Sequence, residues 1–410
     1  MTMDTTVAVL ATLDTKGHEA EYLREQLGRL GSAALLVDIG VLGTPQCRAD
    51  VPRNQVAAAG GTTLTALVEH GTREAATPVM AAGAAKLLGD RIAAGTVHAV
   101  IGLGGLQGTA LCTQVLRTMP YGFPKVMVST VASGDVSAYV DVKDITMMFS
   151  VADLLGVNSF TRRLLANAAG AAHGMAQVDV PIVAQGGDKP LIGMSNLGVL
   201  TSGAQLALEL FAARGYEVLV FHAVGSGGRA MEQMMRQGIV GAVFDYAMGE
   251  ITDELFGGLR AGGKQRLTVA GSLGLPQVLC PGGVEHVGVL VPPNTVPARW
   301  QDHQHVFHSP VVLAPRLNEG EMRQVAREIG RRLQSTRGNA VLMLPKHGTG
   351  RYAMPGGPLR DPAGDAAFFA ELKASLPKSI TVVERDLHAE DPAFVRECVD
   401  RLLALVETKA

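Results

Sequence analysis

The chain has 410 residues, of which 47% are hydrophobic, which is enough for two cores of ordinary size and favours two domains over one. Its 36 Lys+Arg residues against 38 Asp+Glu residues give a formal net charge of -2, and neither sign forms a long block. This balance argues against nucleic acid and anionic membranes as partners.

Cysteine usage and the first residues bear on the compartment. Cys47, Cys112, Cys280 and Cys398 form no CxxC pair, which argues against a disulfide framework and a structural zinc site. The first residues lack a basic segment followed by an apolar signal core, and no run of about 18 apolar residues predicts a membrane span. We therefore expect a cytoplasmic protein without a membrane-spanning helix.

In the first half, short runs of Val, Ile and Leu alternate with longer segments of helical period, which is typical of a parallel sheet. The strands are apolar on both faces, so helices are expected to cover both sides of the sheet. The pattern predicts strands at 6–13, 32–40, 97–104 and 125–130, and helices at 18–31, 63–94, 107–119 and 159–176.

The pattern is interrupted near residues 178–190, where two glycines, a charged pair and two prolines indicate a linker. It then resumes, and a last helix is expected after Asp391 as N-cap, with Pro392 at its first position. Further strands are predicted at 190–198, 216–224, 241–248, 276–280, 340–345 and 380–387. We therefore predict an α/β protein with two tandem domains, 1–182 and 183–410, that have mainly parallel sheets and a cleft between them.

A glycine-rich loop, GLGGLQGT, follows the predicted strand at 97–104. It is not a dinucleotide fingerprint, because Gln107 replaces the third glycine, and it lacks the GK[ST] ending of a Walker loop. Gly104, Gly105 and Gly108 still let backbone N–H groups approach an anion at a helix N-terminus, with Thr109 as a hydroxyl donor or a helix cap. Spacing alone leaves a phosphate cradle and a plain turn equally open.

Polar residues also follow the other predicted strands of the first half. Asp14, Thr15 and Lys16 follow the first strand, and a lysine at a helix N-terminus is unfavourable unless an anion is bound. Asp38 lies at the end of the second strand, a position from which an acidic residue often holds a ribose. A polar run begins at the end of the fourth strand, and Asp135 in this run or Asp144 beyond it can be an Mg²⁺ ligand, although surface aspartates are common in loops. This run contains Ser129, Thr130, Ser133, Gly134 and Asp135.

Signals in the second half are weaker. A second glycine-rich loop lies between a predicted strand and a helix, where it can receive a second ligand, although Arg229 is as readily a solvated side chain. His347 lies in a third such loop, for which a mobile surface loop is the simpler interpretation. Three histidines can present two imidazoles to a metal from one face of a strand, with Glu285 and His286 as further candidate ligands, but no second metal motif accompanies them. Cys280 resembles a nucleophile only weakly. The loop contains Gly225, Ser226, Gly227, Gly228 and Arg229, and the histidines are His303, His305 and His308.

Taken in order and spacing, these motifs resemble the Tm-one-like ATP-binding family, whose plant member is a tobamovirus-resistance protein. The first half matches through TLDTKGHE, VDIGVLG, GLGGLQGTAL, PKVMVSTVASGDVSAYV, DITMMFSVADLLGVN and LANAAGAAHGMA. The second half matches through EVLVFHAVGSGGRAME, ITDEL and VLCPGG. The resemblance spans nearly the whole chain, but the antiviral role of the plant member is not carried over.

The resemblance implies two Rossmann-like domains, ATP bound in the first, and a homodimer. Leu106 and Gln107 replace small residues of the family's GGSGGT loop, and His308-Ser309-Pro310 replaces its HNP, so this chain's second ligand can differ. By position, the ATP site consists of Asp14, Thr15, Lys16, Gly104, Gly105, Gly108, Thr109 and the VSTVASGD loop.

From these residues we expect an ATP-binding protein in which the N–H groups of 104–109 contact phosphates, Lys16 neutralises charge and a carboxylate such as Asp135 holds Mg²⁺. If it is an enzyme, phosphoryl transfer or ligase-type activation of a small acid or sugar acid is the expected chemistry. Two alternatives stay open: a non-catalytic, nucleotide-dependent binding protein, and a site for another phosphorylated metabolite.

Overall fold

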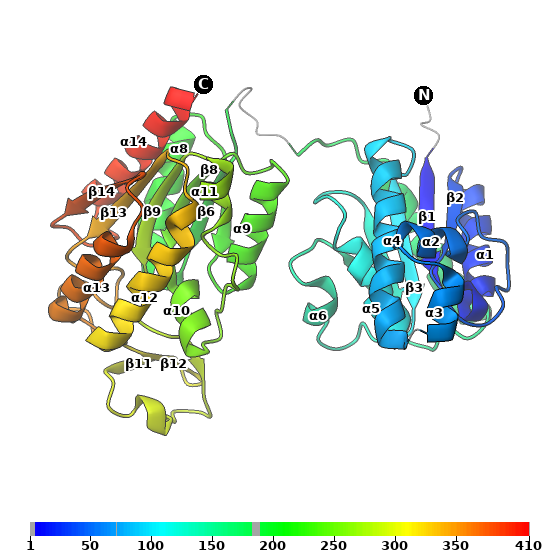
Figure 1. Ribbon diagram of the computed structural model, residues 1–410, viewed down its shortest axis with the longest axis horizontal. Coiled ribbons are helices and arrows are strands. Elements are labelled where there is room, and N and C mark those ends of the chain that lie inside the picture. The colour runs from blue at the N-terminus through cyan, green and yellow to red at the C-terminus, as the bar shows by residue number, and fades with distance from the viewer. Residues whose placement is uncertain (1–4, 71, 183–188, 410) are drawn as a thin grey trace. The chain divides into compact units, whose positions relative to one another are not determined.

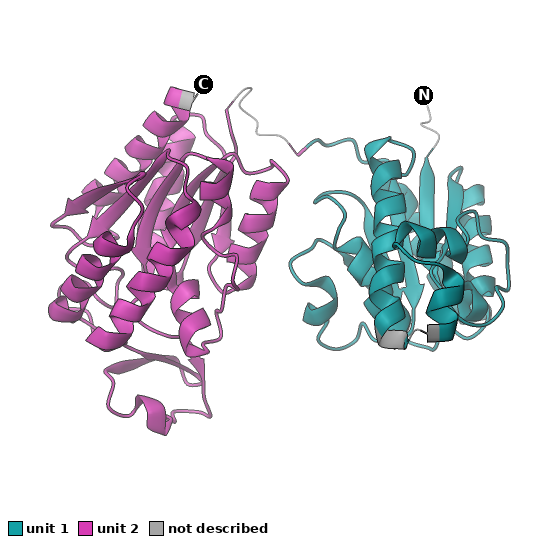
Figure 2. Ribbon diagram, in the orientation of Figure 1, with its two compact units in different colours: residues 1–181 teal, residues 182–410 magenta. Residues whose placement is uncertain are grey.

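Two parallel β-sheets, one in each half of the chain, form the framework of the protein (Figure 1). The structure is a computed structural model that describes residues 5–70, 72–182 and 189–409. The chain divides into unit 1, residues 1–181, and unit 2, residues 182–410 (Figure 2). The predicted start of the second domain, residue 183, lies outside the described residues.

Unit 1 contains a five-stranded sheet of order β2-β1-β3-β4-β5, and all its strand pairs are parallel. The register aligns the strand ends, since Ala11 pairs with Asp38 and Gly104 with Ser129. The predicted parallel α/β class is confirmed for this half. The strands are β1 (Thr6–Ala11), β2 (Ala33–Asp38), β3 (Ala99–Gly104), β4 (Lys125–Ser129) and β5 (Thr146–Phe149).

Helices cover both faces of this sheet, as its doubly apolar strands require. One core packs the sheet against α1 and α7, and the other packs it against α2, α4 and α5. The helices are α1 (Leu13–Arg29), α2 (Arg53–Ala59), α3 (Leu64–His70), α4 (Arg73–Ala93), α5 (Leu106–Leu116), α6 (Ser137–Val140) and α7 (Ser159–Ala176).

The single helix predicted over 63–94 is wrong, because two helices, α3 and α4, occupy this range. Thr72 has an extended backbone, and its side chain accepts the N–H of Ala75, so a new helix begins there. Helix α2 was not predicted either. Its seven residues are too few to show a helical period.

Unit 2 contains a six-stranded parallel sheet of order β14-β13-β9-β8-β6-β7. The parallel α/β prediction is therefore confirmed here too. Its strands are β6 (Ile192–Asn196), β7 (Val218–His222), β8 (Ala242–Ala247), β9 (Gln277–Gly282), β13 (Ala340–Pro345) and β14 (Ile380–Arg385). Its helices are η1 (Gly198–Leu200), α8 (Thr201–Ala213), α9 (Ser226–Arg236), α10 (Gly249–Phe256), α11 (Val269–Leu273), η2 (Ala298–Trp300), α12 (Glu319–Arg332), η3 (Leu333–Ser335), α13 (Pro362–Ser375) and α14 (Pro392–Lys409).

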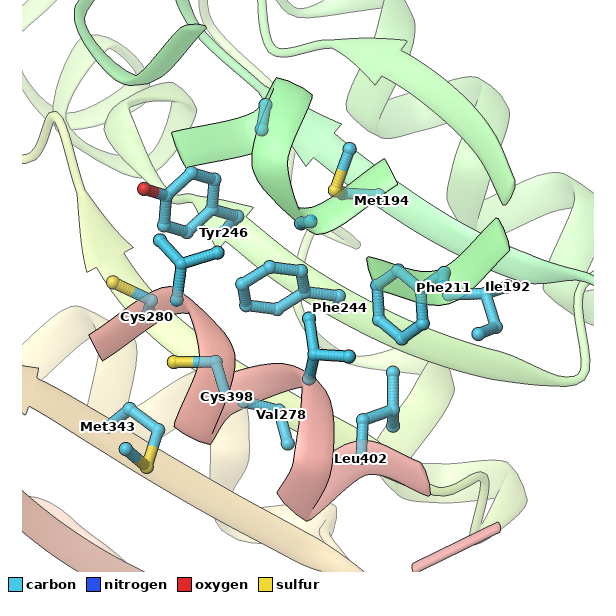
Figure 3. Packing of buried hydrophobic residues seen from close by; sticks show 14 of the residues in the cluster. Ile192, Met194, Phe211, Phe244, Tyr246, Val278, Cys280, Met343, Cys398 and Leu402 are labelled. Carbon is cyan, nitrogen blue, oxygen red and sulfur yellow. The ribbon is translucent and has the colours of Figure 1, made fainter. Parts of the chain in front are cut away.

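The core of unit 2 has one layer on each side of the sheet. Figure 3 shows part of the layer beneath α8 and α14, where the Phe244 and Tyr246 rings stack with centroids 4.9 Å apart. The Tyr246 hydroxyl donates to the Ala389 carbonyl at 2.6 Å, so this buried polar group is satisfied. On the opposite face the sheet packs against α10, α12 and α13.

A small antiparallel sheet of order β10-β12-β11 joins β9 to α12 and was not predicted from the sequence. It contains β10 (Val289–Leu290), β11 (His305–Ser309) and β12 (Val312–Pro315). Its strands have two to five residues, which is short for period-two alternation to show. Among the described residues, no helix combines the length and apolar character needed to cross a bilayer.

Candidate functional site

The carboxyl edge of the unit 1 sheet brings together most of the residues singled out from the sequence. The aligned register places the ends of β1, β2, β3 and β4 along one edge. The chain runs from β1 to β2 on one side and returns to β3 on the other, so the strand order reverses between β1 and β3. Open α/β sheets bind ligands at such a reversal. Residues 12–16 and 105–109, which include the first turns of α1 and α5, flank it.

The N-terminus of α1 is satisfied internally by Asp38. The Asp38 Oδ1 accepts the N–H groups of Leu13, at 3.1 Å, and Gly40, at 2.9 Å. Asp38 is 1% exposed, and burial raises the pKa of its carboxyl, against the opposing effects of these N–H groups and the Arg53 charge. Capping α1 is a sufficient structural reason for Asp38, and its predicted contact with a ribose stays a prediction.

The predicted site residues at the start of α1 lie in three different surroundings. Asp14 lies beneath the loop that follows β2, where its Oδ1 is buried without a hydrogen-bond partner among the described residues. The Thr15 hydroxyl contacts the Thr12 hydroxyl at 2.9 Å. Lys16 departs from helical geometry within α1, and its Nζ donates to the Leu154 carbonyl. No carboxylate of the described residues forms an ion pair with Lys16, so its charge is available to an anion.

The glycines of the GLGGLQGT loop, between β3 and α5, have different roles. A Cβ atom on Gly104 would lie 2.6 Å from the Cα of Gly108, so close backbone packing requires this glycine. Gly105 has an ordinary φ of −78°, and the nearest atom to a Cβ there, the Thr130 Oγ1, would be 3.6 Å away. Packing therefore gives no reason for a glycine at 105, whereas a ligand close to the backbone would give one.

Helix α5 begins at this loop without an internal acceptor for its first turn. Gly105 supplies no side-chain cap, and the first turn contains no acidic residue. The N–H groups of Leu106, Gln107 and Gly108 have no acceptor among the described residues. By contrast, Asp38, Thr72 and Asn158 serve α1, α4 and α7. Of the long helices of unit 1, α5 is thus the one whose described N-terminus is open to an anion.

Thr109, predicted as a donor or a cap, is fully buried, and its hydroxyl lies 2.7 Å from that of Ser129. This contact joins α5 to the end of β4 and leaves neither hydroxyl at the surface. Thr130 donates its N–H to the Gly104 carbonyl at 3.3 Å. The loop after β4 thus begins beside the glycine-rich loop after β3.

Farther along this loop, Ser133, Gly134 and Asp135 are exposed. The N–H of Ser137 donates to the Asp135 Oδ1 at 2.9 Å and is the main cause that lowers the pKa of this carboxyl. Asp135 is therefore ionised at neutral pH and remains a candidate ligand for Mg²⁺.

The glycine-rich loop of unit 2 binds a carboxylate of the chain itself. The Glu250 Oε1 accepts the N–H groups of Gly225, at 2.6 Å, and Gly228, at 3.1 Å. A Cβ on Gly228 would lie 2.1 Å from Glu250, and one on Gly227 would lie 1.9 Å from the His222 carbonyl oxygen. Internal packing therefore accounts for these glycines, and the anion position predicted at the start of α9 is filled by Glu250.

Arg266 forms ion pairs with this carboxylate and with two others inside unit 2. Its guanidinium lies 2.6 Å from Glu250, 2.5 Å from Asp245 and 3.6 Å from Glu232. All four side chains are at most 4% exposed. Burial raises the pKa of Glu232, the farthest of the three, to about 7. Sequence reasoning missed this cluster because its members come from α9, β8, α10 and the loop before α11.

The remaining candidates of unit 2 do not converge on one centre. Ser226, Arg229 and His347 are exposed, and the Arg229 Nε donates to the Gly225 carbonyl at 3.3 Å. His303 contacts Glu321 at 3.0 Å, whereas His308 contacts Tyr352 at 3.0 Å. Cys280 is buried, which raises the pKa of its thiol. Among the described residues, no three His, Cys, Asp or Glu side chains are grouped as a metal site would need.

Comparisons with known proteins match this chain to one family in both of its halves. The model of the Uncharacterised protein family (UPF0261) N-terminal domain matches residues 5–181, and the C-terminal domain model matches residues 189–406. A UPF0261 protein of Clostridium tetani is 34% identical over 406 residues, which cover 99% of this chain and 100% of that protein.

A plant protein is also similar over much of the chain. The ToMV resistance protein Tm-1(GCR237) of Solanum lycopersicum is 32% identical over 313 residues, which cover 75% of this chain and 41% of that protein. Among solved structures, MurG of Acinetobacter baumannii aligns over 98% of this chain and 99% of its own, at 13% identity and a TM-score of 0.24. This structural similarity is too low to bear on function.

Gly104→Ala and Gly105→Ala should differ in stability. The first places a Cβ against backbone, so we expect unit 1 to lose about 1–3 kcal/mol of unfolding free energy, whereas the second should change it by less than about 0.5 kcal/mol. Urea unfolding followed by far-UV circular dichroism measures both. The tryptophan fluorescence transition is the internal control, because the one tryptophan, Trp300, lies in unit 2. Equal losses of unfolding free energy in the two variants would contradict the different packing roles of Gly104 and Gly105.

Arg266→Ala should destabilise unit 2 by about 3–5 kcal/mol, because it leaves buried carboxylates without their cation. Unfolding in urea is followed by Trp300 fluorescence. The matched control is Arg327→Ala, since Arg327 is 54% exposed and forms a surface ion pair with Glu371. We expect this control to lose no more than about 1 kcal/mol. Similar losses in the two variants would show that the cluster has no special role.

Proposed function

This chain belongs to the Uncharacterised protein family (UPF0261), and on that premise we propose that it is a cytoplasmic, homodimeric protein that binds ATP in unit 1. The single observation that carries the proposal is the open N-terminus of α5. Three adjacent N–H groups there lack an acceptor among the described residues, and Gly105 leaves the space before them open. Such a terminus attracts phosphate through both its hydrogen-bond donors and the helix dipole.

Lys16 supports the same interpretation from the neighbouring strand. It follows β1, the strand on the other side of the reversal from β3, and is half-buried without a carboxylate partner among the described residues. A partly buried cation gains more from an anionic ligand than a fully solvated one does. The Lys16 ammonium is thus suited to neutralise a phosphate whose other oxygens face the α5 N–H groups.

Two further features fit a nucleoside triphosphate. Leu106, at the start of α5, and Val151, in the loop after β5, are 62% and 67% exposed, and a nucleobase can cover such apolar surface. Asp135 offers an ionised carboxylate, and Mg²⁺ is commonly held by one or two carboxylates together with the substrate phosphates. The resemblance to the Tm-one-like ATP-binding family points to the same nucleotide.

ATP binding is compatible with an enzyme and with a non-catalytic binding protein, and only the enzyme would turn ATP over. An enzyme would transfer a phosphoryl group or activate a small acid or sugar acid, with the N–H groups of 106–108 and Lys16 stabilising charge on the phosphates. A binding protein would use ATP to set its conformation. ADP release in the presence of candidate acids decides between them.

Wild-type protein should gain thermal stability from ATP with Mg²⁺, and Gly105→Val should abolish this gain while it leaves the fold intact. The valine side chain would fill the space in front of the α5 N–H groups. Thermal unfolding with ATP, ADP, NADPH and sugar phosphates measures the effect, with Gly89→Val as a control at an exposed position of α4, where an added side chain meets no neighbour. Normal ATP stabilisation of Gly105→Val would show that the loop is only a turn, and a response to sugar phosphates alone would replace ATP by another phosphorylated metabolite.

A further inference from the structure

Unit 2 has its own reversal of strand order, between β6 and β8, and polar groups without partners lie beside it. The segment after β6 enters η1 and α8, and within the described residues the N–H groups of Gly198 and Val199 have no acceptor. The Asn196 Oδ1, at the end of β6, is buried and has no hydrogen-bond partner in the described part of the chain. Buried polar atoms are normally paired, so this region is incompletely satisfied by the chain alone.

A histidine and a tyrosine from distant segments meet beside this turn. The His308 Nδ1, on β11, lies 3.0 Å from the Tyr352 hydroxyl, in the loop after β13. The His308 Cε1 lies 4.0 Å from where a Cβ of Gly198 would stand. When the Tyr352 hydroxyl donates to Nδ1, the neutral imidazole carries its proton on Nε2, so His308 can donate to an oxygen of a ligand.

The buried His286 and Glu285 side chains position the Tyr352 ring. Its ring meets the His286 ring edge-to-face, with centroids 5.5 Å apart, and the His286 Nδ1 lies 3.0 Å from the buried Glu285 carboxylate. Burial is the main cause that raises the pKa of Tyr352, so its hydroxyl stays protonated at neutral pH. The pair therefore has a fixed inner member, Tyr352, and an exposed outer one, His308.

Arg351 adds a cation, and its contacts indicate the class of ligand. Its backbone N–H donates to the Val199 carbonyl at 2.9 Å, and its Nη2 contacts Glu390 at 3.1 Å and the Ser202 hydroxyl at 3.0 Å. Glu390 also accepts the N–H of Ser202 at 3.0 Å. The start of α8 and Arg351 thus already bind one carboxylate, and the Arg351 side chain is still 47% exposed.

We propose that His308, Tyr352, Arg351 and the N–H groups of Gly198 and Val199 form a binding site in unit 2 for a small carboxylate. Apart from the Asn196 Oδ1 acceptor and the Glu390 carboxylate, which Arg351 and Ser202 already bind, the groups at this site are donors and one cation, which match a carboxylate's acceptor oxygens. The His308 Nε2 and the two N–H groups contact the ligand, Arg351 supplies charge, and Tyr352 orients the imidazole. The site is independent of nucleotide binding in unit 1.

The test is titration of full-length protein, labelled on its histidine rings, with malonate, followed by imidazole NMR resonances. The resonance absent from His308→Ala should shift saturably, and that variant should bind malonate about 10–100-fold more weakly, as expected for loss of a hydrogen bond to a charged ligand. Tyr352→Phe keeps the ring and should show a smaller loss. His305→Ala, on the same strand, is the matched control and should bind normally.

Three results would overturn this assignment: no saturable shift with malonate, equal weakening in His305→Ala, or saturation by inorganic phosphate but not by malonate. Measuring ATP stabilisation on the same variants distinguishes a failure of this site from a failure of the proposed ATP site. His308→Ala should retain any ATP stabilisation of wild type, whereas Gly105→Val should retain malonate binding.

Discussion

Helix N-termini at the carboxyl edge of a parallel sheet carry N–H groups that the helix itself cannot satisfy, and the rest of this structure depends on how each is satisfied. Asp38 serves α1, Glu250 serves α9 and Glu390 serves α8. In all three cases a carboxylate from another element occupies the position where a ligand anion could bind. These internal anions tie neighbouring loops together and fix the edge of each sheet.

This constraint makes α5 informative. Its loop contains a glycine that packing requires, Gly104, and one that packing does not, Gly105. The hydroxyl of Thr109 faces inward to Ser129, so the donors left in the first turn belong to the backbone. A single loop thus separates into a part that builds the fold and a part that is free to meet a ligand. Nucleotide binding is proposed for the second part.

The two units share a fold but satisfy their glycine-rich loops differently. In unit 2 the loop closes on Glu250, and this buried carboxylate pairs with Arg266, which also contacts Asp245 and Glu232. Buried charges of this kind need their partner far more than surface pairs do. Glycine spacing alone cannot tell such a loop from a ligand cradle, because both need backbone N–H groups close to an anion.

The sequence by itself determined the parallel α/β class, the main strands of both halves and the gathering of Lys16, Gly104 and Asp135 at strand ends, because apolar periodicity and turn residues are local signals. It also carried the family, through motifs spread over nearly the whole chain. Only the tertiary structure decided that Glu250 fills one glycine-rich loop, that Asp38 caps α1 and that His308 meets Tyr352. These pairs are far apart in the chain, and a side chain's partner depends on which elements pack together, which local pattern does not encode.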